Sequence, residues 1–124
     1  MTMKTIATAV GIILAGVSMA AHHSPVMFDM AKTQTLEGTV VEFAWTNPHS
    51  SIQLDVATPA GMERWGVEMG SPNSMVKAGW KSNIIKPGDK VTVAVHPLKS
   101  GEHGGIFMSI TLPDGRKLGG RAAE

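Results

Sequence analysis

The chain has 124 residues and a formal net charge of +1 with neutral histidines, from 11 basic and 10 acidic side chains. It contains no cysteine, which excludes disulfide bridges and every thiolate metal site. Because the charge is balanced and aromatic residues make up only 5% of the chain, nothing in the composition favours a nucleic-acid partner.

The first twenty residues are typical of a secretory signal peptide. Lys4 precedes an apolar run over residues 6–17, which is shorter than the roughly 20 residues a membrane-spanning helix needs, and small residues follow. We expect cleavage after Ala20; cleavage one residue later would leave His22 first. An uncleaved membrane anchor is the alternative. Cleavage would give a periplasmic or secreted protein without a stable membrane anchor.

The part after the signal peptide, about 100 residues, is enough for one small domain with one core. We expect a signal peptide over 1–20, an N-terminal arm over 21–34, a small β-barrel domain over 35–118 and a disordered tail over 119–124.

Two extended runs joined by a polar corner, residues 46–50, open the predicted barrel. In the first, the alternation of apolar residues slips at Val40 and Val41, which predicts a β-bulge, and Gly38 favours a bend. The second run, 52–56, alternates as a half-buried strand does.

The rest of the domain is predicted from turns and alternation. Residues 62–69 form a third strand, and Ser71 caps a short helix that runs through Ala78 and is stopped by Gly79. Residues 90–95 form the next strand. In the last strand we expect inward side chains at Ile106, Met108 and Ile110.

The order of three strands, one helix and two strands indicates an all-β fold with one short helix. It fits a five-stranded OB-like barrel (β-β-β-α-β-β), in which the helix closes one end between strands three and four. Another small barrel or a half-open meander has the same number of elements and stays an alternative.

Several short motifs span nearly the whole chain after the signal peptide. They are His22-His23-Ser24, Phe28-Asp29, Thr35-Leu36-Glu37-Gly38-Thr39-Val40, Trp45-Thr46-Asn47-Pro48-His49, Gly70-Ser71-Pro72-Asn73, Gly79-Trp80, Lys86-Pro87-Gly88-Asp89 and Leu112-Pro113-Asp114-Gly115-Arg116-Lys117-Leu118. Together they resemble a family of small exported bacterial proteins classed as a domain of unknown function, and the chain departs from the family pattern around residues 25–27. The resemblance implies no activity, cofactor or catalytic residue.

Histidines carry the chemistry that the sequence offers. If Ala21 is the first residue of the processed chain, its amine, two backbone nitrogens and the imidazole of His23 can form a square-planar set, which suits Cu(II) or Ni(II). If His22 is first, its amine and ring can chelate a metal together, and His49 can add another imidazole. Copper is therefore the first expected metal and zinc the second, with His22, His23 and His49 as ligands.

Each of these histidines also has a simpler interpretation. The adjacent histidines can be a by-product of the cleavage region, and the ring of His49 can hydrogen-bond the backbone of its own corner. His96 and His103 flank a glycine-rich loop and are expected to be solvated.

Methionine and tryptophan side chains are expected mainly in packing. Met69 and Met108 are predicted to face inward, as are Trp45 and Trp65. Met27 and Met30 lie near the histidine pair, and their thioethers could assist a copper site.

Three hypotheses follow. The first is an exported protein that binds copper. The second is a metal-free OB-like interaction module for an envelope protein or a small ligand. The third is a copper enzyme that needs His22 as its first residue, so retention of Ala21 would exclude it. Because no hydrolase or transferase motif is present, we expect no enzyme.

Overall fold

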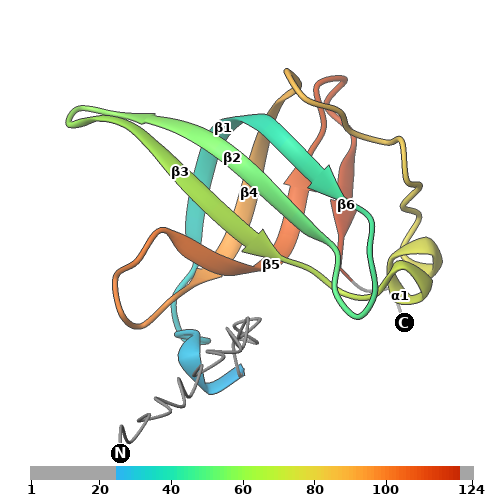
Figure 1. Ribbon diagram of the computed structural model, residues 1–124, viewed down its shortest axis with the longest axis horizontal. Coiled ribbons are helices and arrows are strands. Elements are labelled where there is room, and N and C mark those ends of the chain that lie inside the picture. Colours follow the sequence, from blue (N-terminus) through green and yellow to red (C-terminus); the bar gives the residue numbers. More distant parts are fainter. Residues whose placement is uncertain (1–24, 121–124) are drawn as a thin grey trace, which may run out of the picture.

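The computed structural model describes residues 25–120, and its strands wrap into a barrel (Figure 1). The elements are a 3-10 turn η1 (Pro25–Met27), strands β1 (Gln34–Ala44), β2 (Ser51–Thr58) and β3 (Gly61–Glu68), helix α1 (Pro72–Lys77), and strands β4 (Lys90–Pro97), β5 (Gly104–Thr111) and β6 (Lys117–Gly119).

The barrel is closed, and its topology is the expected one. The strand order is β3-β2-β1-β4-β5-β6, and an additional parallel pairing between β3 and β5 joins the two ends of the five-stranded part. All other neighbours pair antiparallel. The prediction of an OB-like barrel with one helix between the third and fourth strands is confirmed.

Strand β1 is shared by both halves of the barrel, and the predicted bulge makes this possible. Its register with β2 shifts between Val40 and Glu42. Gly38 pairs with Val56 of β2 on one side and with Val91 of β4 on the other. A Cβ atom at Gly38 would come within 2.9 Å of the Asp55 carbonyl oxygen, so only glycine fits without displacement.

The prediction for the last barrel strand is wrong for two of three residues. Ile110 is buried as expected, but Ile106 and Met108 are only half-buried. The register between β4 and β5 changes after Ala94, which pairs with Ser109, whereas Val95 pairs with Phe107. Met108 is therefore passed over, the alternation reverses, and Phe107 takes the inward position.

A helix and a tryptophan close one end of the barrel. The Ser71 side chain accepts a hydrogen bond from the Ser74 N–H at 3.3 Å, which confirms the predicted N-cap. Met75 and Trp80 are buried, and the indole of Trp80 donates to the Gly119 carbonyl at 2.9 Å. The last strand, β6, ends at Gly119, one residue past the expected end of the domain.

Packing of the other predicted residues is mixed. Met69 and Trp65 belong to the core as expected, whereas Trp45 is only half-buried, with its ring edge-on to Phe43 at 5.7 Å. Strand β1 ends at Ala44, so Trp45 lies just beyond it and packs against the core while only partly buried. In residues 25–120 no helix has the length and apolar character needed to cross a membrane.

Candidate functional site

The corner between β1 and β2 is a compact loop that fixes the position of His49. The peptide bond between Asn47 and Pro48 is cis. The Thr46 hydroxyl donates to the His49 carbonyl at 3.1 Å, and the Ser50 N–H donates to the Gly70 carbonyl at 2.9 Å. The loop is therefore held by its own residues on one side and by the end of β3 on the other.

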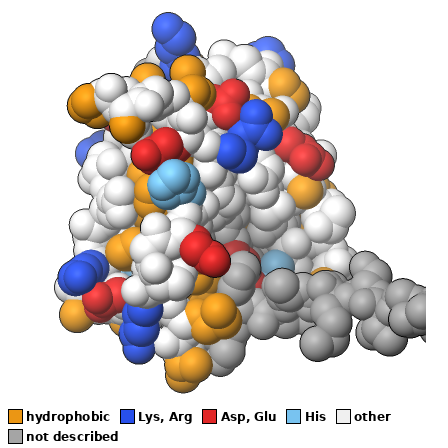
Figure 2. All heavy atoms as spheres, turned by 60° about the vertical axis from the view of Figure 1, so that its left-hand side comes forward, with side chains coloured by type: hydrophobic (Ala, Val, Ile, Leu, Met, Phe, Trp, Pro, Cys, Tyr) orange, Lys and Arg blue, Asp and Glu red, His pale blue; other side chains and the backbone are white. Residues whose placement is uncertain are grey.

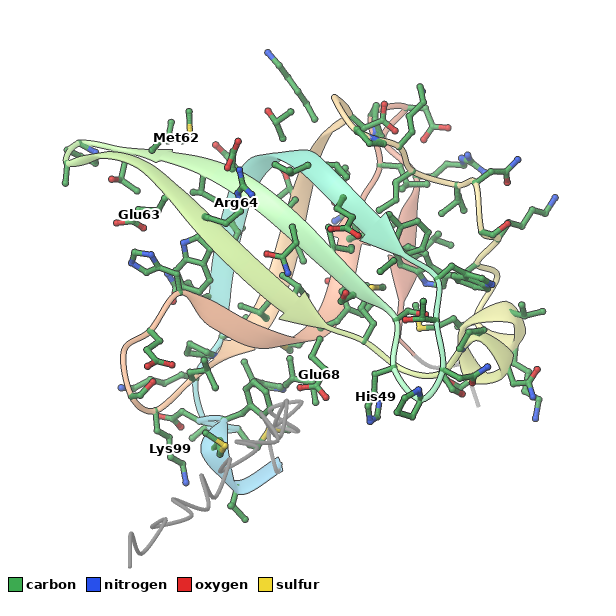
Figure 3. All side chains as sticks on the ribbon, in the orientation of Figure 1. His49, Met62, Glu63, Arg64, Glu68 and Lys99 are labelled. Carbon is green, nitrogen blue, oxygen red and sulfur yellow. The ribbon has the colours of Figure 1, made fainter. Side chains whose placement is uncertain are left out.

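The ring of His49 has one nitrogen engaged and one available. Nδ1 lies 3.2 Å from the Met69 carbonyl oxygen, a partner that only accepts, so Nδ1 carries the proton in this contact. Nε2 then has the free lone pair in the neutral ring, and it lies 3.9 Å from Oε1 of Glu68. Figure 3 shows both side chains at the same end of the barrel. This arrangement can accept a proton or offer an imidazole to a metal.

The other two predicted metal ligands, His22 and His23, lie outside the described residues. Within residues 25–120 there is no group of three or more His, Asp or Glu side chains that could hold a metal ion.

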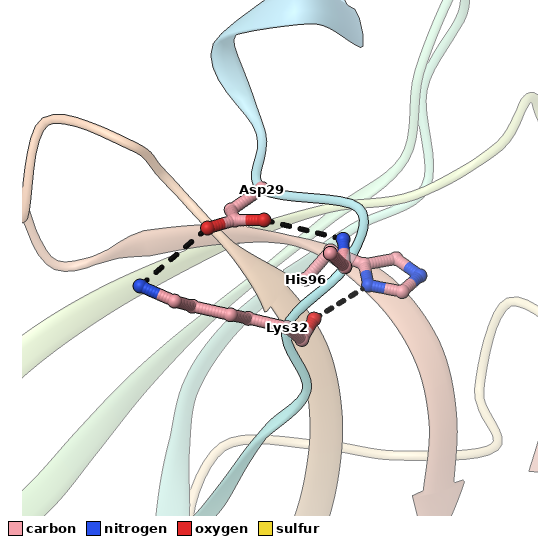
Figure 4. A network of polar contacts seen from close by, with 4 residues as sticks. Asp29, Lys32 and His96 are labelled. Carbon is pink, nitrogen blue, oxygen red and sulfur yellow. Dashed lines mark hydrogen bonds and ion pairs between the residues drawn. The ribbon is translucent and has the colours of Figure 1, made fainter.

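His96, expected to be solvated, anchors the N-terminal arm instead. Its Nδ1 lies 2.7 Å from the Lys32 carbonyl oxygen. Lys32 also pairs with Asp29, 3.5 Å from Nζ to Oδ2, and Asp29 accepts from the Ala31 N–H at 3.2 Å (Figure 4). The histidine thus fastens a turn of the arm to β4.

His103 is likewise part of a cluster. Its ring stacks on Trp65 with centroids 5.3 Å apart, and Nε2 lies 3.4 Å from Oε2 of Glu63. The same carboxylate oxygen accepts from the Trp65 indole at 3.3 Å. Because both partners come from β3, His103 holds the β4–β5 loop against that strand.

A groove of about 240 Å³ runs along the seam where β3 meets β5. Ser51, Gln53 and Glu68 line it from β2 and β3, glycines form part of it, and Phe28 and Leu98 form the apolar side. Among residues 25–120, no lysine or arginine lines it. On the face shown in Figure 2, basic and acidic side chains are interspersed, so neither sign forms a large patch.

The N-terminal arm borders this groove. Phe28 is 2% exposed and forms a β-bridge with Leu98. The Asp29 N–H donates to the Pro97 carbonyl at 2.8 Å, and the Lys99 N–H donates to the Met27 carbonyl at 2.9 Å. Pro25, the first described residue, is three positions before Phe28, which lines the groove.

Met27 and Met30, whose thioethers the sequence offers to a copper site, are both exposed. Neither thioether is committed to the core, so both remain accessible to solvent.

A second hollow, of about 330 Å³, lies on β1, β4 and β5. It is larger but shallower, and Glu37 and Lys90 line it with opposite charges. The smaller groove is lined by Phe28 of the N-terminal arm and by Glu68, whose carboxylate lies 3.9 Å from His49, so it is the better candidate site.

The groove was not predicted from the sequence as a site. The alternation of residues in β2 and β3 places Gln53 and Glu68 on the outer side of the hairpin. The sequence therefore contained a signal for this part of the groove. The approach of Phe28 and Gly104 to the same place depends on the β3–β5 closure, which no local pattern encodes.

The strand order and the helix position define the class: a small OB-like barrel with a groove on its β2–β3 face. A family model described as "Family of unknown function (DUF6152)" matches residues 10–108, and the chain belongs to that family. No curated protein and no solved structure matches the chain.

Proposed function

We propose that the protein is exported and binds its ligand without transforming it, and that this ligand is Cu(II). The proposed ligands are His22 and His23 near the processed terminus and Nε2 of His49. The observation that supports this best is the ring of His49, whose Nδ1 contacts the Met69 carbonyl at 3.2 Å and leaves Nε2 for a metal.

The attachment of the arm supports the same proposal. Pro25 starts the described chain, and Phe28 lies in the groove that Glu68 also lines. His23 is two residues before Pro25 in the chain. Glu68 in turn faces His49 at 3.9 Å. The proposal requires the histidine pair to reach the end of the groove where Glu68 and His49 lie.

Mass spectrometry of the exported protein, with and without added Cu(II), tests this proposal. We expect a chain that begins at Ala21 or His22 and one tightly bound copper ion. Replacing both His22 and His23 with alanine should abolish tight binding, and His49→Ala should weaken it about ten-fold, as loss of one ligand or its support does. His103→Ala is the control, because that ring is engaged with Trp65 and Glu63 of β3. Unchanged copper binding in the double variant would refute the proposal.

A second candidate is a metal-free binding module for an envelope protein or a small ligand. The observation that favours it is the groove of about 240 Å³, which needs no metal to be complete. On this hypothesis, substitution of the residues that line the groove weakens ligand binding, whereas substitution of His22 and His23 does not.

A further inference from the structure

The groove contains polar side chains that no described residue satisfies. Neither the amide of Gln53 nor the hydroxyl of Ser51 makes a hydrogen bond within residues 25–120. The carboxylate of Glu68 has one contact there, with His49 at 3.9 Å. Donors and acceptors from neighbouring strands thus converge on one place, as they do in small-molecule sites.

Next to these groups the wall of the groove is bare backbone. Gly66 pairs with Gly104 across the β3–β5 seam, and both line the groove. A Cβ atom at Gly66 would lie 3.4 Å from Nε2 of Gln53, so it would project beside the amide. Glycine at this point lets a ligand ring approach the sheet closely.

Charge and polarity narrow the ligand class. Of the described residues, one carboxylate and no basic side chain line the groove, which disfavours phosphate and carboxylate ligands. An amide, a hydroxyl and a carboxylate together offer both donors and acceptors, and the Phe28 and Leu98 side is apolar. A ring with several hydroxyl groups and an apolar C–H face has matching chemistry.

We propose that the groove binds a neutral saccharide unit, with Gln53, Ser51 and Glu68 as hydrogen-bonding partners. This rests on the second candidate function and names its ligand. The corresponding face of OB barrels is used for oligosaccharides and oligonucleotides, which is a fold-level analogy only. The acidic lining favours the saccharide.

Titration of the ¹⁵N-labelled full chain with glucose, N-acetylglucosamine, maltose and cellobiose tests this. We expect shifts of the Gly66, Gly104 and Gly105 amides and of the Gln53 side-chain amide with at least one sugar. Gln53→Leu should weaken binding about ten-fold through lost hydrogen bonds. Gly66→Ala should block the ring while leaving the spectrum folded, because its Cβ meets only ordinary contacts.

Met62→Ala is the matched control, because Met62 points to the same side of β3 and is 67% exposed but lies outside the groove. Absence of shifts with all four sugars, shifts spread away from the groove, or shifts with a short oligonucleotide alone would refute the proposal. Gly66→Ala tests only the groove and His49→Ala tests copper, so the two proposals fail separately.

Discussion

Single residues show where this small barrel has polar groups without partners. The hydroxyl of Ser50 is buried and makes no hydrogen bond within the described part of the chain. Its backbone is well used, since its N–H donates to Gly70 and its carbonyl accepts from the Met69 N–H, both at 2.9 Å. The residue is therefore positioned by its main chain, and its side chain adds a desolvation cost.

Ser50→Ala is accordingly expected to leave the free energy of unfolding unchanged or to raise it by up to about 1 kcal/mol. Urea denaturation measures this. Thr58→Ala is the contrast, because the Thr58 hydroxyl donates to the Gly61 carbonyl at 2.8 Å. Its loss should cost about 0.5–1.5 kcal/mol. A loss at Ser50 as large as at Thr58 would show that the Ser50 hydroxyl is bonded.

Asp114 provides a pH-dependent contact at the surface. The Arg116 backbone N–H, and then its side chain, donate to the carboxylate and hold the pKa of Asp114 below its ordinary value. A lowered pKa in the folded state means that the contact stabilises the fold above the unfolded-state pKa. The contribution is lost as the pH falls through the lower, folded-state pKa.

We expect Arg116→Ala to raise the pKa of Asp114 only part of the way to its ordinary value, because the backbone N–H at position 116 remains. A carboxyl-detected NMR titration follows this directly. Complete return to the ordinary value in the variant would assign the whole effect to the guanidinium instead.

At the level of elements, the pairing of β1 depends more on the small size of Gly38 than on the β-propensity of its other residues. The strand pairs on both sides at this point, and a Cβ would meet the Asp55 carbonyl at 2.9 Å and a Val56 methyl at 3.2 Å. Backbone cannot move aside as a flexible side chain can.

Gly38→Ala should therefore lower the free energy of unfolding by about 1–3 kcal/mol, the usual cost of overpacking. Gly66→Ala, which meets only the flexible end of Gln53 at 3.4 Å, should be close to neutral. Denaturant melts of the two variants compare them. Equal destabilisation would mean that strand glycines matter here only through their backbone freedom.

The elements also show how far the sequence was informative. Alternation and turn residues located the strands and the capped helix, and the parity slip located the β1 bulge, since these are local signals. The reversal around Met108 depends on the partner strand β4, so the alternation of β5 alone misplaced it. For the site, the sequence indicated His49 but not the groove that Glu68 and Phe28 line.

At the level of the whole molecule, the barrel has one weak seam. β3 and β5 are joined by only three register pairs, whereas β2 and β3 share eight. One of the three seam pairs consists of two glycines, and a second contains one glycine. The seam residues are also far apart in the chain, so its closure costs more conformational entropy than a hairpin does.

Native-state hydrogen exchange should reveal this difference. The Gly66 amide, which donates to the His103 carbonyl at 3.1 Å, should be at least about ten-fold less protected than the Leu54 amide in central β2. Equal protection at the two amides would show that the seam and the hairpins open as one unit.

The seam also sets an order for folding. The hairpins β1–β2 and β2–β3 join neighbours in the chain, whereas residues 66–68 must find residues 104–106 across the helix and β4. Contacts of such long separation form slowly, so this junction is expected to close last. The surface that crosses it exists only in fully assembled molecules, and any compound that prefers this surface will recognise mature chains and ignore partly folded ones.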